Sequence, residues 1–361
     1  PIHRALFLSA MLLLCGTSHA QTSRMSSRFL ARGEKALLEV AVPGMKPPEL
    51  RSMPEVPGVV IQQLSNRPVL NPTSSRMYEQ VFQFFVSSHV VGNHTIPSME
   101  VMVGASKTTT EPIEFTVFNP DDLKLSEATV GGISFRYAAA FRAANPSPYN
   151  GEATPVELKV YVPNDLPVVD WGIPDFEREG VTTWRLQPNQ RPSLVNLLGM
   201  PYMAVAYPST LAPIRTGAVS LGPAKVRLTL RLLDLSEGLP QQVPHQVFLD
   251  VPKLDLESKP LPEGAPDGFE NAIGSFRINA SAEVTELQEG DPLPLEIEVR
   301  GSGNLDTLRP PVPVDSTGWK LYETTAEQRG DERRELSGSA RFRLFMRPLE
   351  LKNQAPAFKL V

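Results

Sequence analysis

The sequence predicts an all-β fold, on three observations: its proline content, its alternation of apolar and polar residues, and the regular turns between the alternating segments. Proline occupies 36 of the 361 positions, about twice its usual share of ~5%. Each internal proline removes a helical hydrogen bond and clashes with the preceding turn, so long helices are excluded. Apolar residues make up 41% of the chain, as folded rather than disordered proteins require.

Alternating segments indicate strands with one buried face and one solvated face. In residues 156–162 the valines and leucine are expected to point inward, and Glu157, Lys159 and Tyr161 are expected on the solvated face. The segments 226–232 and 293–299 follow the same rule. Prolines and glycines separate the strands about every ten residues, a spacing typical of immunoglobulin-like β-sandwich domains.

A threefold repeat indicates three copies of such a domain. A glycine followed by an acidic residue precedes a strand three times: Gly33-Glu34, Gly151-Glu152 and Gly290-Asp291. Each unit then closes with a polar turn, a proline and another alternating segment, the prolines being Pro97, Pro223 and Pro356. The opening glycine and closing proline are 64, 72 and 66 residues apart. Chance recurrence of Gly-acid pairs is the alternative explanation.

The predicted domains are 21–120, 121–258 and 259–361, in tandem after an N-terminal signal peptide at 1–20. The second domain is the longest, and 138–150 and 165–199 are expected to be insertions. The third is expected to be truncated. A proline-rich linker over 257–266 would act as a semi-rigid spacer, which favours an extended rod.

The first twenty residues have the layout of a secretory signal peptide. Arg4 precedes an apolar run from Ala5 to Cys15, too short to span a bilayer. The small-x-small triplet Ser18-His19-Ala20 then precedes a cleavage site between Ala20 and Gln21. Cleavage would remove the only cysteine, leaving neither a disulfide nor a thiol nucleophile. A lipid-modified Cys15 is the alternative, and the bulky Leu14 before it argues against that.

Composition and motifs predict a binding protein rather than an enzyme. The net charge is −5 and basic residues are scattered, so nucleic-acid binding through a basic face is not expected. The sequence has no Gly-x-Ser-x-Gly nucleophile motif and no phosphate-cradling loop. His89 and His94 lack the Cys or acidic partners of a zinc site, and the acidic residues lack calcium-loop spacing. No catalytic, cofactor or metal site is therefore predicted.

Three tryptophans are candidate partner contacts, because this residue type is enriched in binding hot spots: Trp171, Trp184 and Trp319. Packing in a core is the alternative reading of each. A coplanar exposed pair would instead favour the second candidate function, a carbohydrate- or surface-binding β-sandwich module.

Several sequence stretches are similar to the bacterial BatD family of oxygen-tolerance, or aerotolerance, proteins. In the last third of the chain they are 268–276 (GFENAIGSF), 290–293 (GDPL), 301–308 (GSGNLDTL), 319–322 (WKLY) and 342–348 (FRLFMRP). Earlier ones are 82–86 (FQFFV) and 92–97 (GNHTIP). The resemblance covers most of the chain after residue 20 and is most specific over 268–361.

The resemblance implies an exported protein on the periplasmic side of the inner membrane, anchored there by a helix that follows the sandwich domains. It also implies protein partners, namely MoxR-type ATPases and von Willebrand factor A-domain membrane proteins, in an oxygen-tolerance or envelope-stress response. The family pattern contains no catalytic residues to transfer. The sequence departs from it by ending before any anchor and by having Lys352-Asn353 where a glycine is usual. The expected function is that of a non-enzymatic scaffold.

Overall fold

The computed structural model describes residues 22–43, 48–65, 69–72, 78–189, 191–234, 241–265, 269, 272–282, 291–311, 318–330 and 336–349. Among these residues the regular elements are β-strands and two short 3-10 helices, η1 (Pro120–Asp122) and η2 (Leu305–Thr307), joined by turns and loops. The predicted all-β fold is confirmed. Across these described ranges, no helix is long and apolar enough to cross a membrane. The predicted signal peptide with its cleavage site, Gly290 and Pro356 lie outside the described residues.

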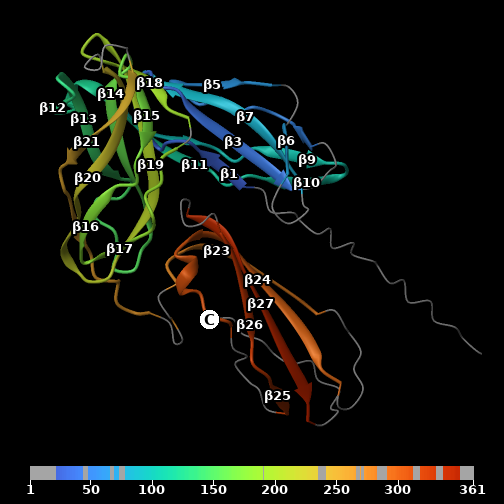
Figure 1. Cartoon of the computed structure of the whole chain (residues 1–361). Coiled ribbons are helices and arrows are strands. Elements are labelled where there is room, and N and C mark those ends of the chain that lie inside the picture. Colours follow the sequence, from blue (N-terminus) through green and yellow to red (C-terminus); the bar gives the residue numbers. More distant parts are fainter. Residues whose placement is uncertain are drawn as a thin grey trace, which may run out of the picture.

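Strand ladders join residues within three segments, called here the N-terminal region (22–118), the central region (125–259) and the C-terminal region (274–348) (Figure 1). The N-terminal strands are β1 (Thr22–Met25), β2 (Phe29–Ala31), β3 (Ala36–Pro43), β4 (Pro48–Leu50), β5 (Val59–Gln63), β6 (Val69–Pro72), β7 (Tyr78–Ser88), β8 (Gly92–Ile96), β9 (Glu100–Val103), β10 (Ser106–Thr109) and β11 (Ile113–Phe118).

The N-terminal region has an immunoglobulin-like strand order. One sheet runs β1-β3-β7-β5, with β6 also on β7, and strands β4, β9 and β10 form another. A further ladder, β2-β11-β8, extends this second sheet. In it β8 precedes β9 across a break at Pro97, and β11 follows β10. These orders correspond to the ABED and CFG sheets of an immunoglobulin-like sandwich. Apolar side chains from both layers, such as Leu38, Phe84 and Phe115, fill the core between them.

The central region repeats this order with longer strands. They are β12 (Leu125–Val130), β13 (Ile133–Ala143), β14 (Thr154–Pro163), β15 (Val168–Trp171), β16 (Asp175–Glu179), β17 (Val181–Thr183), β18 (Ser193–Leu197), β19 (Met200–Pro213), β20 (Gly217–Asp234), β21 (Gln241–Val251) and β22 (Leu254–Ser258). One sheet runs β12-β13-β14-β19 with β17 and β18 on β19, and the other is centred on β20. The stretches expected as insertions, 138–150 and 165–199, supply strand residues to both sheets, because β19 and β20 are each long enough to pair with several strands.

The C-terminal region contains β23 (Gly274–Ala282), β24 (Leu293–Gly303), β25 (Trp319–Leu321), β26 (Thr325–Gly330) and β27 (Ser337–Pro348). Their order, β23-β24-β27 with β25 and β26 on β27, matches the first sheet of the other two regions. The alternation predicted for 293–299 is confirmed, since Ile297 and Val299 are buried beside Phe342. The domain ranges 21–120, 121–258 and 259–361, and their number, stay predictions.

The Gly-acid repeat has a structural basis in the first two regions. Gly33 and Gly151 have φ values of +82° and +83°, a left-handed conformation that favours glycine. The backbone N–H of Glu34 donates to the carbonyl of Ala31, and that of Glu152 donates to Tyr149, both at 2.9 Å. Oε2 of Glu34 accepts the backbone N–H of Ala31 at 2.8 Å, and Oε2 of Glu152 accepts that of Tyr149 at 2.7 Å. The glutamate therefore closes its own turn just before β3 in the N-terminal region and just before β14 in the central region.

The prediction that residues 156–162 form a strand with one solvated face is wrong. Glu157, Lys159 and Tyr161 are only 2%, 3% and 1% exposed. The valines and leucine on the other face of β14 are buried as expected. Both faces are buried because the N-terminal region packs on the outer face of the sheet that contains β14 (Figure 1).

Candidate functional site

Apolar side chains of the N-terminal and central regions form one buried cluster between them. Phe29, Ala31 and Phe118 come from the N-terminal region. They pack with Ala138, Tyr161, Val195, Leu197, Tyr202 and Ala204 of the central region. The guanidinium of Arg142 also lies over the Phe118 ring, 3.7 Å from its centre. This cluster forms an apolar interface that holds the two regions together.

A buried ion pair crosses the same interface. Lys159 Nζ, on β14, lies 2.6 Å from Glu34 Oε1, and the two side chains are 4% and 1% exposed. The ammonium also donates to Ser27 Oγ at 3.1 Å and to the carbonyl of Phe29 at 2.9 Å. An ammonium has three N–H donors, so all of its hydrogen-bonding capacity is directed at the N-terminal region.

Glu157 is a second buried carboxylate beside this pair. It accepts hydrogen bonds from Ser27 Oγ at 2.8 Å and from the backbone N–H of Arg28 at 3.3 Å. Its Oε1 lies 4.0 Å from Lys159 Nζ. Burial raises the pKa of Glu157 from 4.5 to about 7, although Lys159 opposes the shift. The interface therefore contains a carboxyl group that titrates near neutral pH.

Glu34 is held by both regions. Its Oε1 accepts from Lys159 and from the hydroxyl of Ser193, which begins β18. Burial, with Glu34 and Glu157 nearby, raises the pKa of Tyr161 well above its ordinary value of 10. Because its second oxygen binds the backbone of its own turn, Glu34 links the repeated turn to the central region.

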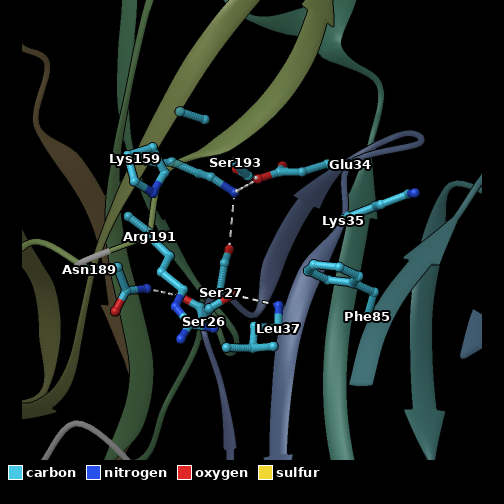
Figure 2. A pocket seen from close by; sticks show the side chains of 13 residues that line it. Ser26, Ser27, Glu34, Lys35, Leu37, Phe85, Lys159, Asn189, Arg191 and Ser193 are labelled. Carbon is cyan, nitrogen blue, oxygen red and sulfur yellow. Dashed lines mark hydrogen bonds and ion pairs between the residues drawn. The ribbon is translucent and has the colours of Figure 1, made fainter. Parts of the chain in front are cut away.

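A cavity of about 400 Å³ opens beside the ion pair, and Figure 2 shows that side chains of both regions surround it. Its lining is Ser26, Ser27, Glu34, Lys35, Leu37 and Phe85 from the N-terminal region, with Lys159, Asn189, Arg191, Pro192, Ser193, Ala204 and Ala206 from the central region. The amide of Asn189 donates to the carbonyl of Ser26 across it (Figure 2).

The contact between Ser27 and Lys159 is not arranged for nucleophilic catalysis. A lysine that activates a serine needs a free lone pair to accept the hydroxyl proton. Here Lys159 is a donor in three hydrogen bonds, one of them to a carboxylate. Ser27 Oγ in turn donates to Glu157 rather than to a base facing the cavity. The geometry fits a structural polar network.

The histidines considered as metal ligands have other contacts. His94 stacks on Phe115 at 5.3 Å, and its Nε2 lies 2.8 Å from the Val90 carbonyl. His89 lies beside Gly33 of the repeated turn. Among the residues that the structure describes, no three His, Cys, Asp or Glu side chains gather as metal ligands.

The three tryptophans lie on separate elements. Trp171 ends β15 and packs, half-buried, on the central core. Trp184 follows β17 and is 36% exposed, whereas Trp319 begins β25 and is half-buried. The aromatic ring contacts found in the described ranges do not include a pair of these tryptophans. Their role as partner contacts stays a prediction.

Sequence reasoning missed the residues of the buried network: Ser27, Glu34, Glu157, Lys159 and Ser193. Two signals pointed to them. Glu34 belongs to the repeated Gly-acid turn, and Glu157 and Lys159 alternate with fully apolar residues in β14. Alternation of this kind is also produced by a solvated face, so it could not reveal the second packing surface.

The outer face of the β15-β20-β21 sheet, called here the central outer face, exposes large apolar side chains. Phe248 on β21 is 59% exposed and Leu233 on β20 is 61% exposed. Val169 on β15 and Ile173 just after it are 48% and 68% exposed. Arg227, which is paired in register with Phe248, forms an ion pair with Asp170 at 3.3 Å. Apolar groups thus flank a charged pair on one face.

Comparisons with known proteins identify no family. No protein-family model matches the chain, and no curated protein matches it. Among solved structures, the Escherichia coli adhesin FdeC is 10% identical with a TM-score of 0.17, covering 95% of this chain and 96% of that one. The Yersinia pseudotuberculosis adhesin InvE is 10% identical with a TM-score of 0.15, and the match covers 62% of this chain and 57% of InvE. A marsupial T cell receptor is 7% identical with a TM-score of 0.16, and the match covers 90% of this chain and 92% of the receptor chain. Similarity this low carries no functional argument, so the chain is classified by its own strand order, as an all-β protein of immunoglobulin-like architecture.

Proposed function

We propose that this chain is a non-enzymatic interaction protein that binds protein partners through the central outer face. The observation that carries the proposal is the exposure of Val169, Ile173 and Phe248 near the Arg227–Asp170 pair, with Leu233 exposed six positions further along β20. Single exposed apolar residues are normal on protein surfaces, but a group of them rimmed by polar residues marks an interaction site.

The polar groups on this face have the character of an interface as well. Arg227 is held by Asp170 and lies next to Phe248 across the strands. Arginine and aromatic residues are enriched in the residues that dominate binding energy. A partner that covers Phe248 would also remove water from the Arg227–Asp170 pair.

The rigid joint between the N-terminal and central regions supports a scaffold role. The shared apolar cluster and the Glu34–Lys159 pair fix the orientation of one region on the other. A binding face on the central region is then held at a constant angle to the N-terminal region. Preorganisation of this kind lowers the entropic cost of binding.

The cellular role that we propose is oxygen tolerance or envelope stress, on the periplasmic side of the inner membrane. The partners would be von Willebrand factor A-domain membrane proteins that work with a MoxR-type ATPase. This part of the proposal is supported by the BatD-like sequence stretches, above all those in 268–361.

The test is co-purification of the full-length protein from its native membranes, followed by mass spectrometry. We expect a Phe248→Ser/Leu233→Ser variant to lose partners that the wild type retains. The matched control is Val60→Ser, which removes a side chain that is 58% exposed on β5 of the N-terminal region. Recovery of the same partners by the wild type and the double variant would refute binding through this face. Recovery of partners that include neither an A-domain protein nor an ATPase would refute the proposed cellular role alone.

A further inference from the structure

We propose that the cavity between the N-terminal and central regions binds a small carboxylated sugar. This inference goes beyond the proposed protein-binding function and does not depend on it, because the cavity lining contains no residue of the central outer face. Its volume of about 400 Å³ lies within the ~300–1,000 Å³ range of small-molecule pockets.

The charges of the lining favour an anion. Lys159 and Glu34 neutralise each other at the inner end. Lys35 and Arg191, both exposed, have no ion-pair partner within the described part of the chain. Two cations thus line a cavity in a protein whose net charge is −5. An arginine can hold a carboxylate through two parallel hydrogen bonds.

A second negative charge on the ligand would be unfavourable. One ammonium, that of Lys159, faces two acidic groups here: Glu34, which lines the cavity, and Glu157, which is bound to the lining residue Ser27. Like charges that approach in a partly buried site repel strongly. A singly charged carboxylate is therefore favoured over a phosphate dianion.

The remaining lining suits a ring that carries hydroxyl groups. Leu37 and Phe85 are direct cross-strand neighbours on β3 and β7, and they give one apolar wall with an aromatic ring. Lys35 Nζ lies over the Phe85 ring, 6.0 Å from its centre, so a carboxylate held by Lys35 would bring the sugar ring to the same wall. The electron-rich face of an aromatic ring attracts the slightly positive C–H groups of a sugar.

Hydroxyl and amide groups line other parts of the cavity. Ser26 Oγ accepts from the backbone N–H of Leu37, which leaves its own proton to donate. The Asn189 amide nitrogen donates to Ser26, so its oxygen can accept (Figure 2). Ser193 adds a further hydroxyl from β18. Exposed cations, an apolar wall and several hydrogen-bonding groups together match a sugar acid.

The test is isothermal titration calorimetry of the full chain with glucuronate, glucose and inorganic phosphate as separate probes. We expect saturable binding of glucuronate, with glucose and phosphate each binding about tenfold more weakly because one lacks the carboxylate and the other the ring. Lys35→Met and Arg191→Met should each weaken glucuronate binding about tenfold. Lys107→Met is the matched control, since it removes an exposed cation that does not line the cavity.

Each result decides the proposal. Absence of saturable glucuronate binding by the wild type overturns it, as does equal binding by the Arg191→Met and Lys107→Met variants. Phosphate binding as strong as glucuronate binding would reduce the site to a general anion site and would also overturn it. Because Lys35 and Arg191 are exposed, the variants should fold, and unchanged circular dichroism spectra would verify this. Partner recovery through Phe248 is measured separately, so failure here leaves the proposed function unaffected.

Discussion

Glu34 and Lys159 are 125 residues apart in the sequence, yet their side chains meet at 2.6 Å inside the interface between two regions of the chain. The glutamate is fixed by the turn that opens β3, and the lysine projects from the middle of β14. A buried pair of this kind contributes little net stability when it is compared with apolar residues, but it is costly to break. The pair therefore specifies how the two regions dock.

Replacing Lys159 by methionine is expected to destabilise the protein by about 3–5 kcal/mol, because Glu34 would remain buried without its partner charge. Urea denaturation followed by tryptophan fluorescence measures the change. The comparison is Lys107→Met, which breaks an exposed pair with Glu100 and should cost about 0–1 kcal/mol. Equal effects of the two substitutions would show that burial of the Lys159 pair has no energetic weight.

The double variant Lys159→Met/Glu34→Gln is expected to recover a large part of that loss. Glutamine has no charge to leave unpaired, and it can still accept the hydrogen bond from the backbone N–H of Ala31. The same denaturation experiment, arranged as a double-mutant cycle, gives the coupling energy between the two sites. A double variant less stable than Lys159→Met alone would contradict the prediction.

Because of Glu157, the free energy of unfolding is expected to fall as the pH rises from about 4.5 to about 7. The pKa of Glu157 is about 7 in the fold and 4.5 without burial, so the folded state holds the proton more tightly over this interval. Stability from this group is complete below pH 4.5 and is lost as the pH rises through the folded pKa. Glu157→Gln should remove the loss, raising the free energy of unfolding at pH 8 by on the order of 3 kcal/mol.

Denaturation of the wild type and the Glu157→Gln variant at several pH values measures this effect. The prediction concerns the difference between the two proteins, which cancels the titration of all other groups. A difference that stays constant between pH 4.5 and 8 would show that Glu157 ionises as freely in the folded protein as in the unfolded one.

Gly151→Ala is expected to destabilise the central region by about 1–2 kcal/mol, because the position has a φ of +83°. Space is not the cause, since a Cβ there would make only an ordinary contact of 3.5 Å with Ile273. Gly151→Asn should therefore cost less than Gly151→Ala, since asparagine tolerates this conformation better. Thermal unfolding of both variants checks the order, and the reverse order would rule out a conformational origin.

The local part of the structure could be predicted from the sequence, whereas the docking of the regions could not. Alternation identified the inward residues of β14 and β24 because it depends only on the period of a strand. The Gly-acid turns were recognisable because glycine is required where φ is positive. Burial of Glu157 and Lys159 depends instead on a neighbouring region more than 120 residues away, which no local pattern encodes.

The candidate sites were predicted less well for the same reason. Tryptophan was selected for its residue type, but Trp171 packs on a core. The residues that line the cavity come from several strands and loops and share no spacing in the sequence. Phe248 was not among the predicted contacts, because its exposure depends on which face of the sheet remains uncovered.

The contact between the residues just before a Gly-acid turn and the last residues of the same region also affects how the chain responds to tension. Residues before the first Gly-acid turn bond to the last strand, with Arg32 N–H to Phe118 O at 2.9 Å and Thr116 N–H to Arg28 O at 2.8 Å. The central region repeats this, with Asn150 N–H to Lys259 O at 2.8 Å and Lys259 N–H to Pro148 O at 2.9 Å. A force that pulls the two paired segments in opposite directions along their length shears all the bonds of such a ladder at once rather than opening them one by one. The longer parallel ladder, β2 with β11, should therefore resist such a pull better than the single Tyr149–Lys259 bridge of the central region.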